Sequence, residues 1–446
     1  MSPADPVDDY VPGHGDLSYD VCHYDLSLEY RVETNALLAK ATLSAVALTA
    51  TDRVVLDLEG LRVSKVLLDG AVVRFTHRAG RLVVKTGTRL RAGQEFRVQV
   101  AYQGTPLPVH GIDGEAGWEE LSDGVIVASQ PHGAPSWFPC NDRPSNKASY
   151  RIKVAAESAY HVTANGSLVD HRRGASRTTW VFDQAEPMAS YLASVQIGRY
   201  SEQVLATAPT RVIAVRSAAT ASRAALALAR QPEMMLVYSQ LFGRYPFAHY
   251  TVVVTDDALE IPLEAQGMAA FGSNHARTDW DAERLVAHEL AHQWFGNSLT
   301  LGVWRDIWLH EGFACYAEWL WSERSGGPSA QHHAERHWRQ LSRLPQDLVL
   351  ADPGPESMFD DRVYKRGALT LHALRRAAGD GPFFDLLRSW CEQNEHGTVS
   401  TGMFSAHVHE CMGSGPSALL DAWLFRAPLP PLAQTVAPGT GPTANA

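Results

Sequence analysis

The sequence predicts a multidomain α and β protein in which an all-β domain precedes an α+β domain. Two observations lead to this prediction. The chain has 446 residues, which is more than one compact hydrophobic core usually supports. Its hydrophobic pattern also changes, from short alternating segments before about residue 205 to helical periodicity after it. We therefore expect a β-domain over residues 16–205 and a second domain over residues 206–428.

The first domain is predicted from segments in which polar and apolar residues alternate. Period-two alternation that is rich in β-branched residues and bounded by Gly, Asp or Asn is typical of strands with one buried face. The clearest segments are HYDLSLEYRV, RVVLDLEGL, RLVVKTG, EFRVQVAYQG and YRIKVAAE.

The second domain is predicted to be mostly helical. The segment ASRAALALARQPEMMLVYSQLFGRY predicts a helix, and YTVVVTDDALE predicts a strand. Further helices, with glycine or proline at several ends, are expected near residues 281–296, 307–324, 329–343, 364–378, 382–394 and 416–426.

The two termini are expected to lie outside the domains. Residues 1–15 are predicted to be a flexible amino terminus. Residues 429–446 are rich in proline and in polar side chains, so they are predicted to be a disordered tail.

The composition excludes several classes of protein. The net charge is −10 and no Lys/Arg cluster is present, so a nucleic-acid partner is not expected. No run of eighteen apolar residues and no signal-peptide pattern occurs, so neither a membrane span nor secretion is expected. Five scattered cysteines without a C-x-x-C pair are typical of reduced thiols, which favours a cytoplasmic location.

A candidate metal site begins in the stretch AHELAHQWFGN. His288 and His292 are four residues apart, so on a helix both side chains lie on one face and can bind one ion. Glu289 is adjacent and can reach a water on that ion. Because the chain has 19 histidines, a chance match is the competing interpretation. Glu311, separated from His292 by eighteen residues, supplies a third ligand and favours one open zinc site per chain.

Other chemistry-bearing patterns are weaker. His333 and His337 have helical i, i+4 spacing in QHHAERHW but no third ligand, so solvated side chains are expected there. His407 in HVHE is interpreted in the same way. Cys140 is expected to be a buried packing residue, since no activating base can be assigned to it.

Several segments resemble one known family. VAHELAHQWFGN and WRDIWLHEGFA are similar to the zinc aminopeptidases of the aminopeptidase N type, a gluzincin superfamily that includes leukotriene epoxide hydrolase. SYDVCHYDLSL, WFPCNDRPSNKASYRIKV and VYKRGALTLHAL resemble further family segments. The resemblance implies a thermolysin-like α+β catalytic domain and peptide substrates with a free amino terminus. It also implies a short form without the large carboxy-terminal helical domain of longer members.

The resemblance implies roles for individual residues. Glu289 would be the general base, and Tyr364 would donate to the oxyanion of the tetrahedral intermediate. Glu264 would bind the substrate ammonium, although only Glu264 and Gly267 match the family's G-x-M-E-N strand. Gln130 would add a second contact to the ammonium by accepting a hydrogen bond.

Four more polar residues lie where they could orient the ligands: Asp306, Asn297, His310 and Glu318. Glu318 follows Glu311 by seven residues and so shares its helix face. The predicted function is that of a zinc aminopeptidase. Two alternatives stay open, namely an epoxide hydrolase or tripeptidase of the leukotriene hydrolase type, and an inactive relative that acts as a binding or scaffold protein.

Overall fold

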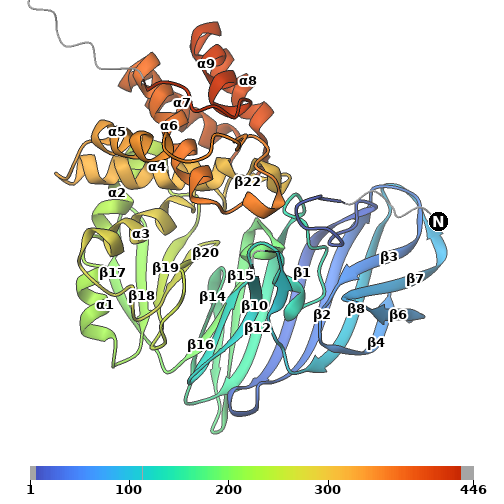
Figure 1. Cartoon of the computed structure of the whole chain (residues 1–446). Coiled ribbons are helices and arrows are strands. Elements are labelled where there is room, and N and C mark those ends of the chain that lie inside the picture. The colour runs from blue at the N-terminus through green and yellow to red at the C-terminus, as the bar shows by residue number, and fades with distance from the viewer. Residues whose placement is uncertain (1–6, 113, 433–446) are drawn as a thin grey trace, which may run out of the picture.

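The computed structural model describes residues 7–112 and 114–432. An amino-terminal part built of sheets lies beside a second part in which a smaller sheet is followed by helices (Figure 1). The predicted order of domains is therefore confirmed. Among the described residues, no helix is both long enough and apolar enough to cross a membrane.

An eight-stranded sheet dominates the β-domain. Its central strand β1 (Tyr19–Arg31) pairs antiparallel with β2 (Ala36–Ala47) and parallel with β12 (Lys147–Glu157). Alternate side chains of β1, such as Tyr24 and Leu26, are almost completely buried, as its alternating sequence predicts. The other strands are β4 (Arg62–Leu68), β5 (Ala71–Val72), β8 (Glu95–Gly104), β14 (Ser167–Arg173) and β15 (Arg177–Ala189).

Two smaller sheets complete this domain. One is five-stranded, and the Trp118 ring on its strand β10 lies 4.9 Å from the ring of Tyr30 on β1, which joins it to the core of the large sheet. Its strands are β9 (Val109–Gly111), β10 (Gly114–Leu121), β11 (Gly124–Ala128), β13 (His161–Ala164) and β16 (Val195–Gly198). The other contains β3 (Thr51–Asp57), β6 (Phe75–Arg78) and β7 (Arg81–Leu90).

The second domain begins with a mixed sheet in the order β17-β18-β19-β21-β20. Its strands are β17 (Ser201–Ala206), β18 (Arg211–Arg216), β19 (His249–Val254), β20 (Leu263–Ala265) and β21 (Met268–Phe271). Since β17 starts at Ser201, the second sheet begins slightly before the expected boundary at residue 205. A two-stranded pair, β22 (Thr300–Leu301) and β23 (Thr398–Val399), lies among the helices.

Helices make up most of the rest. They are α1 (Ala221–Ala227), α2 (Gln231–Phe242), α3 (Trp280–Ala291), α4 (Trp308–Arg324), α5 (Ala330–Leu341), α6 (Asp361–Ala378), α7 (Asp380–Gln393), α8 (Thr401–Met412) and α9 (Ser414–Leu424). The sequence predicted one helix before residue 245, but the structure has two, α1 and α2. The sequence did not predict α8. Side-chain caps from Asp279, Ser329, Asp360 and Ser400 start α3, α5, α6 and α8.

A close crossing of α4 and α6 depends on two glycines. A Cβ atom added to Gly312 of α4 would lie 2.7 Å from the Cα of Gly367 on α6. No larger residue fits at this crossing, so the two backbones approach this closely because both residues are glycine. The contact brings the first turn of α6, which carries Tyr364, toward the first turn of α4, which carries Glu311.

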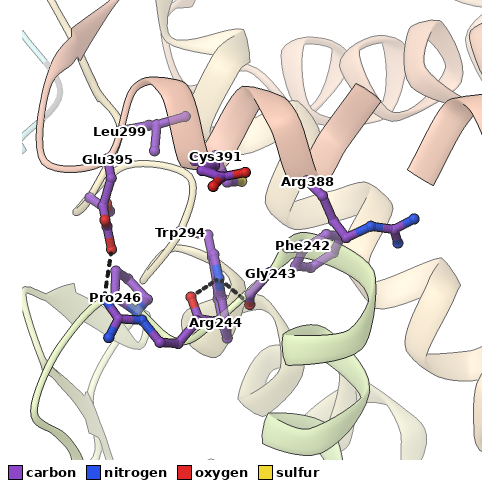
Figure 2. A pocket seen from close by; sticks show the side chains of 11 residues that line it. Phe242, Gly243, Arg244, Pro246, Trp294, Leu299, Arg388, Cys391 and Glu395 are labelled. Carbon is purple, nitrogen blue, oxygen red and sulfur yellow. Dashed lines mark hydrogen bonds and ion pairs between the residues drawn. The ribbon is translucent and has the colours of Figure 1, made fainter. Parts of the chain in front are cut away.

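A cavity of about 360 Å³ lies between the ends of α2, α3 and α7 (Figure 2). The indole nitrogen of Trp294 donates to the carbonyls of Gly243 and Arg244 at its wall, and Arg244 pairs with Glu395 at 3.6 Å. His288, Glu289, His292 and Glu311 are not among its lining residues.

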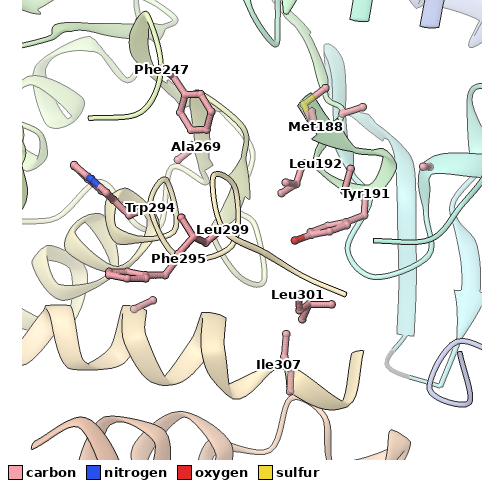
Figure 3. Packing of buried hydrophobic residues seen from close by; sticks show 14 of the residues in the cluster. Met188, Tyr191, Leu192, Phe247, Ala269, Trp294, Phe295, Leu299, Leu301 and Ile307 are labelled. Atoms are coloured by element: carbon pink, nitrogen blue, oxygen red, sulfur yellow. The ribbon is translucent and has the colours of Figure 1, made fainter. Parts of the chain in front are cut away.

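The two domains share one hydrophobic core. Tyr191 and Leu192 from the β-domain face Leu301 and Ile307 from the second domain (Figure 3). Lys147, at the start of β12, is half-buried and donates to the backbone carbonyls of three residues of the second domain: Asn297 (3.1 Å), Ser298 (2.7 Å) and Gly397 (3.3 Å). These contacts fix the β-domain against the turn that follows α3.

The amino-terminal segment also joins the domains. Residues 7–15 were expected to be flexible, but Tyr10 and Val11 are buried. The Tyr10 hydroxyl donates to Asp352 (2.5 Å), and Asp8 accepts from the backbone of Trp304 (2.7 Å). The burial of these two apolar side chains and the two hydrogen bonds order the segment, which its short, proline-bearing and acidic sequence did not predict. Residues 1–6 lie outside the described residues.

The predicted carboxy-terminal tail falls mostly outside the described residues, since residues 433–446 are not described. Its first part packs on the second domain. The backbone of Leu429 donates to Gln346 (2.8 Å), and Pro430 accepts from the indole of Trp338 (2.8 Å).

Candidate active site

Helix α3 presents the H-E-x-x-H residues. Its start is fixed by Asp279, whose carboxylate accepts from the backbone N–H of Ala282 (3.2 Å). His288, Glu289 and His292 are all buried in the last turn and at the end of the helix. The four-residue spacing therefore places both imidazoles on one buried face, as predicted.

Glu311, in the first turn of α4, faces the two histidines. Its Oε2 lies 3.4 Å from His288 Nε2 and 3.5 Å from His292 Nε2. The three potential ligand atoms all lie within 4.8 Å of one another. Two imidazole nitrogens and one carboxylate oxygen that converge in this way form an open three-ligand set for a transition metal such as zinc.

The hydrogen bonds of the two imidazoles test whether this set fits a metal. His288 Nδ1 lies 2.8 Å from a carboxylate oxygen of Glu318, and His292 Nδ1 lies 3.0 Å from the carbonyl oxygen of Phe295. Because both partners only accept, each Nδ1 carries a proton, and Nε2 is the nitrogen of each ring that can bind a metal. Metal-binding histidines use this tautomer when a partner holds the other nitrogen. The residues therefore fit a zinc ion.

Glu318 is held as a carboxylate. Burial opposes its ionisation, but Lys365 and the contact with His288 outweigh burial and lower the pKa of Glu318 to about 2. Arg284 also lies 3.4 Å from its second oxygen. The residue that orients His288 is thus itself fixed by charged neighbours.

Glu289 differs from the carboxylates of Glu311 and Glu318, whose pKa values are lowered by their charged neighbours. Only 4% of it is exposed, and its Oε2 has no hydrogen-bond partner among the described residues. Burial raises the pKa of Glu289 to about 8. An unpartnered, buried carboxylate beside metal ligands can accept a proton from a reacting molecule.

The β20–β21 hairpin places Glu264 against this cluster. A ligand atom of Glu264 lies within 4.8 Å of those of Glu289 and His292. Gln293, which follows His292, accepts from Gly267 N–H (2.8 Å) and donates to the carbonyl of Ala265 (3.2 Å). The sequence interpretation missed Gln293. Its polarity beside the H-E-x-x-H motif was the available signal, but its partners are more than twenty residues away.

Tyr364 lies over a potential metal ligand. Its ring stacks on that of His288 with centroids 6.1 Å apart and planes 22° from parallel. Burial and the nearby Glu311 raise the pKa of Tyr364 above its usual value, so the hydroxyl stays protonated and can donate.

The other residues predicted to orient ligands have different partners. In the part of the chain that the structure describes, only Glu318 of the four hydrogen bonds to a ligand side chain. Asn297 donates to Ala265 (2.9 Å) and so holds the strand that carries Glu264. His310 accepts from Leu301 N–H (2.9 Å). Asp306 accepts from the backbone and hydroxyl of Thr401 and anchors α8.

Gln130 follows β11 and precedes Pro131 across a cis peptide bond. Its amide nitrogen is buried and has no partner among the residues the structure covers. The expected contact with an ammonium stays a prediction.

His333 and His337 are not solvated, contrary to the sequence-based expectation. Both are buried, and His337 stacks on Trp319 with parallel rings 5.3 Å apart. The expectation was wrong because it considered only the polar sequence of α5, whereas the aromatic residue that covers His337 lies on α4. Cys140 is fully buried, as expected.

The fold and this set of groups are typical of metallopeptidases with an H-E-x-x-H helix. Two family models match the chain. The "Peptidase M1 N-terminal domain" covers residues 21–192, and the "Peptidase family M1 domain" covers residues 226–423. A crystal structure of the M1 zinc metallopeptidase from Deinococcus radiodurans is 32% identical, with a TM-score of 0.87, over 96% of this chain and 99% of that one. The chain belongs to peptidase family M1.

Curated relatives carry aminopeptidase names. The leucyl aminopeptidase of Saccharolobus solfataricus is 25% identical over 414 residues, which cover 85% of this chain and 50% of the relative. Aminopeptidase N of Lactococcus lactis is 25% identical over 344 residues, covering 71% of this chain and 40% of the relative. The chain thus spans half or less of the length of these two relatives. The predicted membership of this superfamily is confirmed.

Proposed function

We propose that this chain is a zinc-dependent aminopeptidase, which removes single residues from the amino terminus of peptides. One observation carries the proposal. The carboxylates of Glu264 and Glu289 lie within 4.8 Å of the ligand atom of His292, which also belongs to the His288–His292–Glu311 set. A carboxylate beside the metal can bind an ammonium, which fixes the distance from the peptide's amino terminus to the bond that is cut.

The metal in this proposal is one zinc ion, held by His288, His292 and Glu311. The donor set and the position of the Nε2 atoms favour zinc, and the similar Deinococcus protein is described as a zinc metallopeptidase. When bound, zinc supplies Lewis acidity at the scissile carbonyl and makes the attacking water more acidic.

Four side chains have separate roles in the proposed reaction. Glu289 takes the proton of the attacking water on its unpartnered oxygen and passes it to the leaving amine. Tyr364 donates to the oxygen on which negative charge develops. Glu264 binds the ammonium, and Gln130 adds a neutral hydrogen-bond acceptor.

The substrates in this proposal are peptides with a free amino terminus. A mutant of the Deinococcus protein, 31% identical to this chain, was crystallised with a Tyr-Ser-Ala substrate. That tripeptide supports the assignment of the substrate class. The five cysteines are all free, which supports the inference of a cytoplasmic location.

A screen of aminoacyl-coumarin substrates, with and without a chelator, tests the proposal. We expect release of coumarin that stops on chelation and returns with zinc, and no release from N-acetylated substrates. The variant Glu289→Gln should keep zinc but lose turnover by several orders of magnitude, since an amide cannot accept the proton. Equal cleavage of blocked and free substrates would identify an endopeptidase instead.

Glu264→Ala tests recognition of the amine. We expect kcat/KM to fall by an amount equivalent to about 2–4 kcal/mol, the range for removing one partner of a buried charged pair. Glu260→Ala, which removes an exposed carboxylate four residues earlier, is the matched control and should change little. Similar losses in both variants would remove Glu264 from this role.

A further inference from the structure

The cavity between the ends of α2, α3 and α7 has the features of a small-molecule site (Figure 2). Its volume is about 360 Å³, and apolar side chains form much of its wall, including those of Phe242, Pro246, Trp294 and Leu299. These four residues are almost completely enclosed by the protein. Sites that bind small molecules are typically apolar clefts of this size with a few charged or polar groups at fixed positions.

Opposite charges lie next to each other on one side of the cavity. A guanidinium nitrogen of Arg244 lies 3.6 Å from a carboxylate oxygen of Glu395. Figure 2 shows this pair beside Pro246 and Arg388 on the other side of the cavity. Both side chains of the pair are exposed, so the pair is weak and a ligand can open it at little cost. With Arg388 and Glu392, the charged side chains that line the cavity sum to zero.

These charges match those of an α-amino acid. Its ammonium and carboxylate are attached to one carbon atom, so the two charges are adjacent, as they are in the pair of Arg244 and Glu395. A guanidinium binds a carboxylate, and a carboxylate accepts from an ammonium. A ligand with one charge would be attracted by one member of the pair and repelled by the other.

The rest of the cavity suits an apolar side chain. An amino acid whose charged end lies at the pair would extend toward Trp294 and Leu299, where an apolar side chain loses contact with water. The volume lies near the lower limit for small-molecule sites, which favours one amino acid over a longer peptide.

The wall of the cavity is connected to the metal site. The ring of Phe242 lies 5.0 Å from that of Phe295 and 5.9 Å from that of Trp294. The carbonyl of Phe295 accepts from Nδ1 of the metal ligand His292 at 3.0 Å. Trp294 and Leu299 belong to the same turn after α3, and their backbones are hydrogen bonded at 3.0 Å. A ligand in the cavity therefore contacts the turn that orients His292.

We propose that this cavity is an effector site for a free apolar α-amino acid, such as leucine, which acts on the metal site through the turn after α3. Arg244 binds the carboxylate of the amino acid, and Glu395 binds its ammonium. An apolar amino acid is also a product of the proposed aminopeptidase, so feedback by product rests on that proposed function. Binding of the amino acid to the cavity does not.

Equilibrium dialysis against radiolabelled leucine tests binding without any activity measurement. The zinc-loaded Glu264→Ala variant is used, because Glu264 would bind the ammonium of leucine at the metal site. We expect about one leucine per chain in this background. Adding Arg244→Ala or Glu395→Ala should weaken leucine binding about five-fold or more, since a hydrogen bond between charged groups at a partly exposed position is lost.

The control variants are Arg376→Ala and Glu410→Ala, which remove exposed charges that do not line the cavity and should change little. The backbone carbonyl of Arg244, which accepts from Trp294, stays in Arg244→Ala. An unchanged melting temperature shows that each variant is folded. Absence of bound leucine, or equal binding in all four variants, would overturn the proposal.

Analogues of leucine test the chemistry of the ligand without changing the cavity. The compounds 4-methylpentanoate and 3-methylbutylamine keep the apolar part of leucine, but each has only one of its two charges. Both should bind about five-fold or more weakly than leucine, and so should serine, which lacks the apolar side chain. Equal binding of 4-methylpentanoate and leucine would overturn the assignment of Glu395 to the ammonium.

Kinetics with an aminoacyl-coumarin substrate test the link to the metal site. Leucine that binds only at the metal site raises KM and leaves kcat unchanged, whereas leucine in the cavity should change kcat about two-fold or more. The change in kcat should persist in Glu410→Ala and be reduced in Glu395→Ala. An effect on KM alone would overturn the link to the metal site. A chain that binds leucine in the cavity but cleaves no substrate would contradict the proposed function alone.

Discussion

Replacing Glu318 by glutamine tests how the metal ligand His288 is oriented. Glu318 is 3% exposed and accepts from His288 Nδ1 at 2.8 Å, while Arg284 and Lys365 stabilise its charge. The amide oxygen of glutamine can still accept from His288. Its NH₂ group, however, would face Arg284 and Lys365, and the negative charge that makes His288 a stronger donor to the metal would be lost.

The size of the effect follows from the contacts of Glu318. Its pKa falls from 4.5 to about 2, a difference that corresponds to about 3 kcal/mol of favourable interaction of the carboxylate with all its partners. Only part of this interaction free energy comes from the contact between Glu318 and His288. We therefore expect zinc affinity to fall about 10–100-fold, equivalent to about 1.4–2.7 kcal/mol.

The assay is competition for zinc against a chelator of known affinity, followed by atomic emission of the protein fraction. Glu323→Gln is the matched control, because Glu323 lies on the same helix but pairs with Arg375 at 2.8 Å. The control should keep its zinc affinity within two-fold. If Glu318→Gln also binds zinc as tightly as the unchanged chain, Glu318 does not support the metal site.

Three further predictions concern single side chains. Tyr364→Phe keeps the ring that stacks on His288, so we expect the zinc content and the melting temperature to be unchanged. The value of kcat should fall about 10²–10³-fold, because the donor to the oxyanion is lost. A normal kcat would exclude the hydroxyl from the mechanism. Lys147→Met removes the donor to three backbone carbonyls at the domain junction, so we expect the free energy of unfolding to fall by about 1–3 kcal/mol in a denaturant titration. The exposed Lys153→Met on the same strand is the control and should change little. Burial lowers the pKa of His372 to about 4, so between about pH 6.5 and pH 4 the unfolded chain binds more protons than the folded chain. The free energy of unfolding should therefore fall by up to about 3 kcal/mol as the pH decreases through this window. Melting curves of His372→Asn should show a smaller dependence on pH.

The sequence by itself determined the parts of the site that depend on local periodicity. His288 and His292 face one ion because a helix places residues four apart on one side, and any helix over these residues would do so. The alternation in β1 likewise fixed its buried face, and the change of periodicity fixed the order of the domains.

Other features required contacts between segments far apart in the chain. The α3 sequence does not reveal that Gln293 holds the hairpin carrying Glu264, because the partners of Gln293 are set by how the sheet packs on the helix. Residues 7–15 contain acidic residues, proline and glycine and were expected to be flexible, yet Tyr10 is ordered by a contact with Asp352, 342 residues away. His333 and His337 are buried because α4 supplies Trp319.

The physical reason for this division is the range of the interactions. Spacing within one helix or strand follows from backbone geometry, which is the same wherever the element lies. Burial, the protonation of a carboxylate and the partner of a buried amide depend on which elements meet, and that is decided only when the whole chain packs. The tertiary structure therefore decided which of the four predicted orienting residues contacts a metal ligand, namely Glu318. It also decided the close approach of Glu264 to Glu289 and the glycine crossing that brings α6, with Tyr364, against α4.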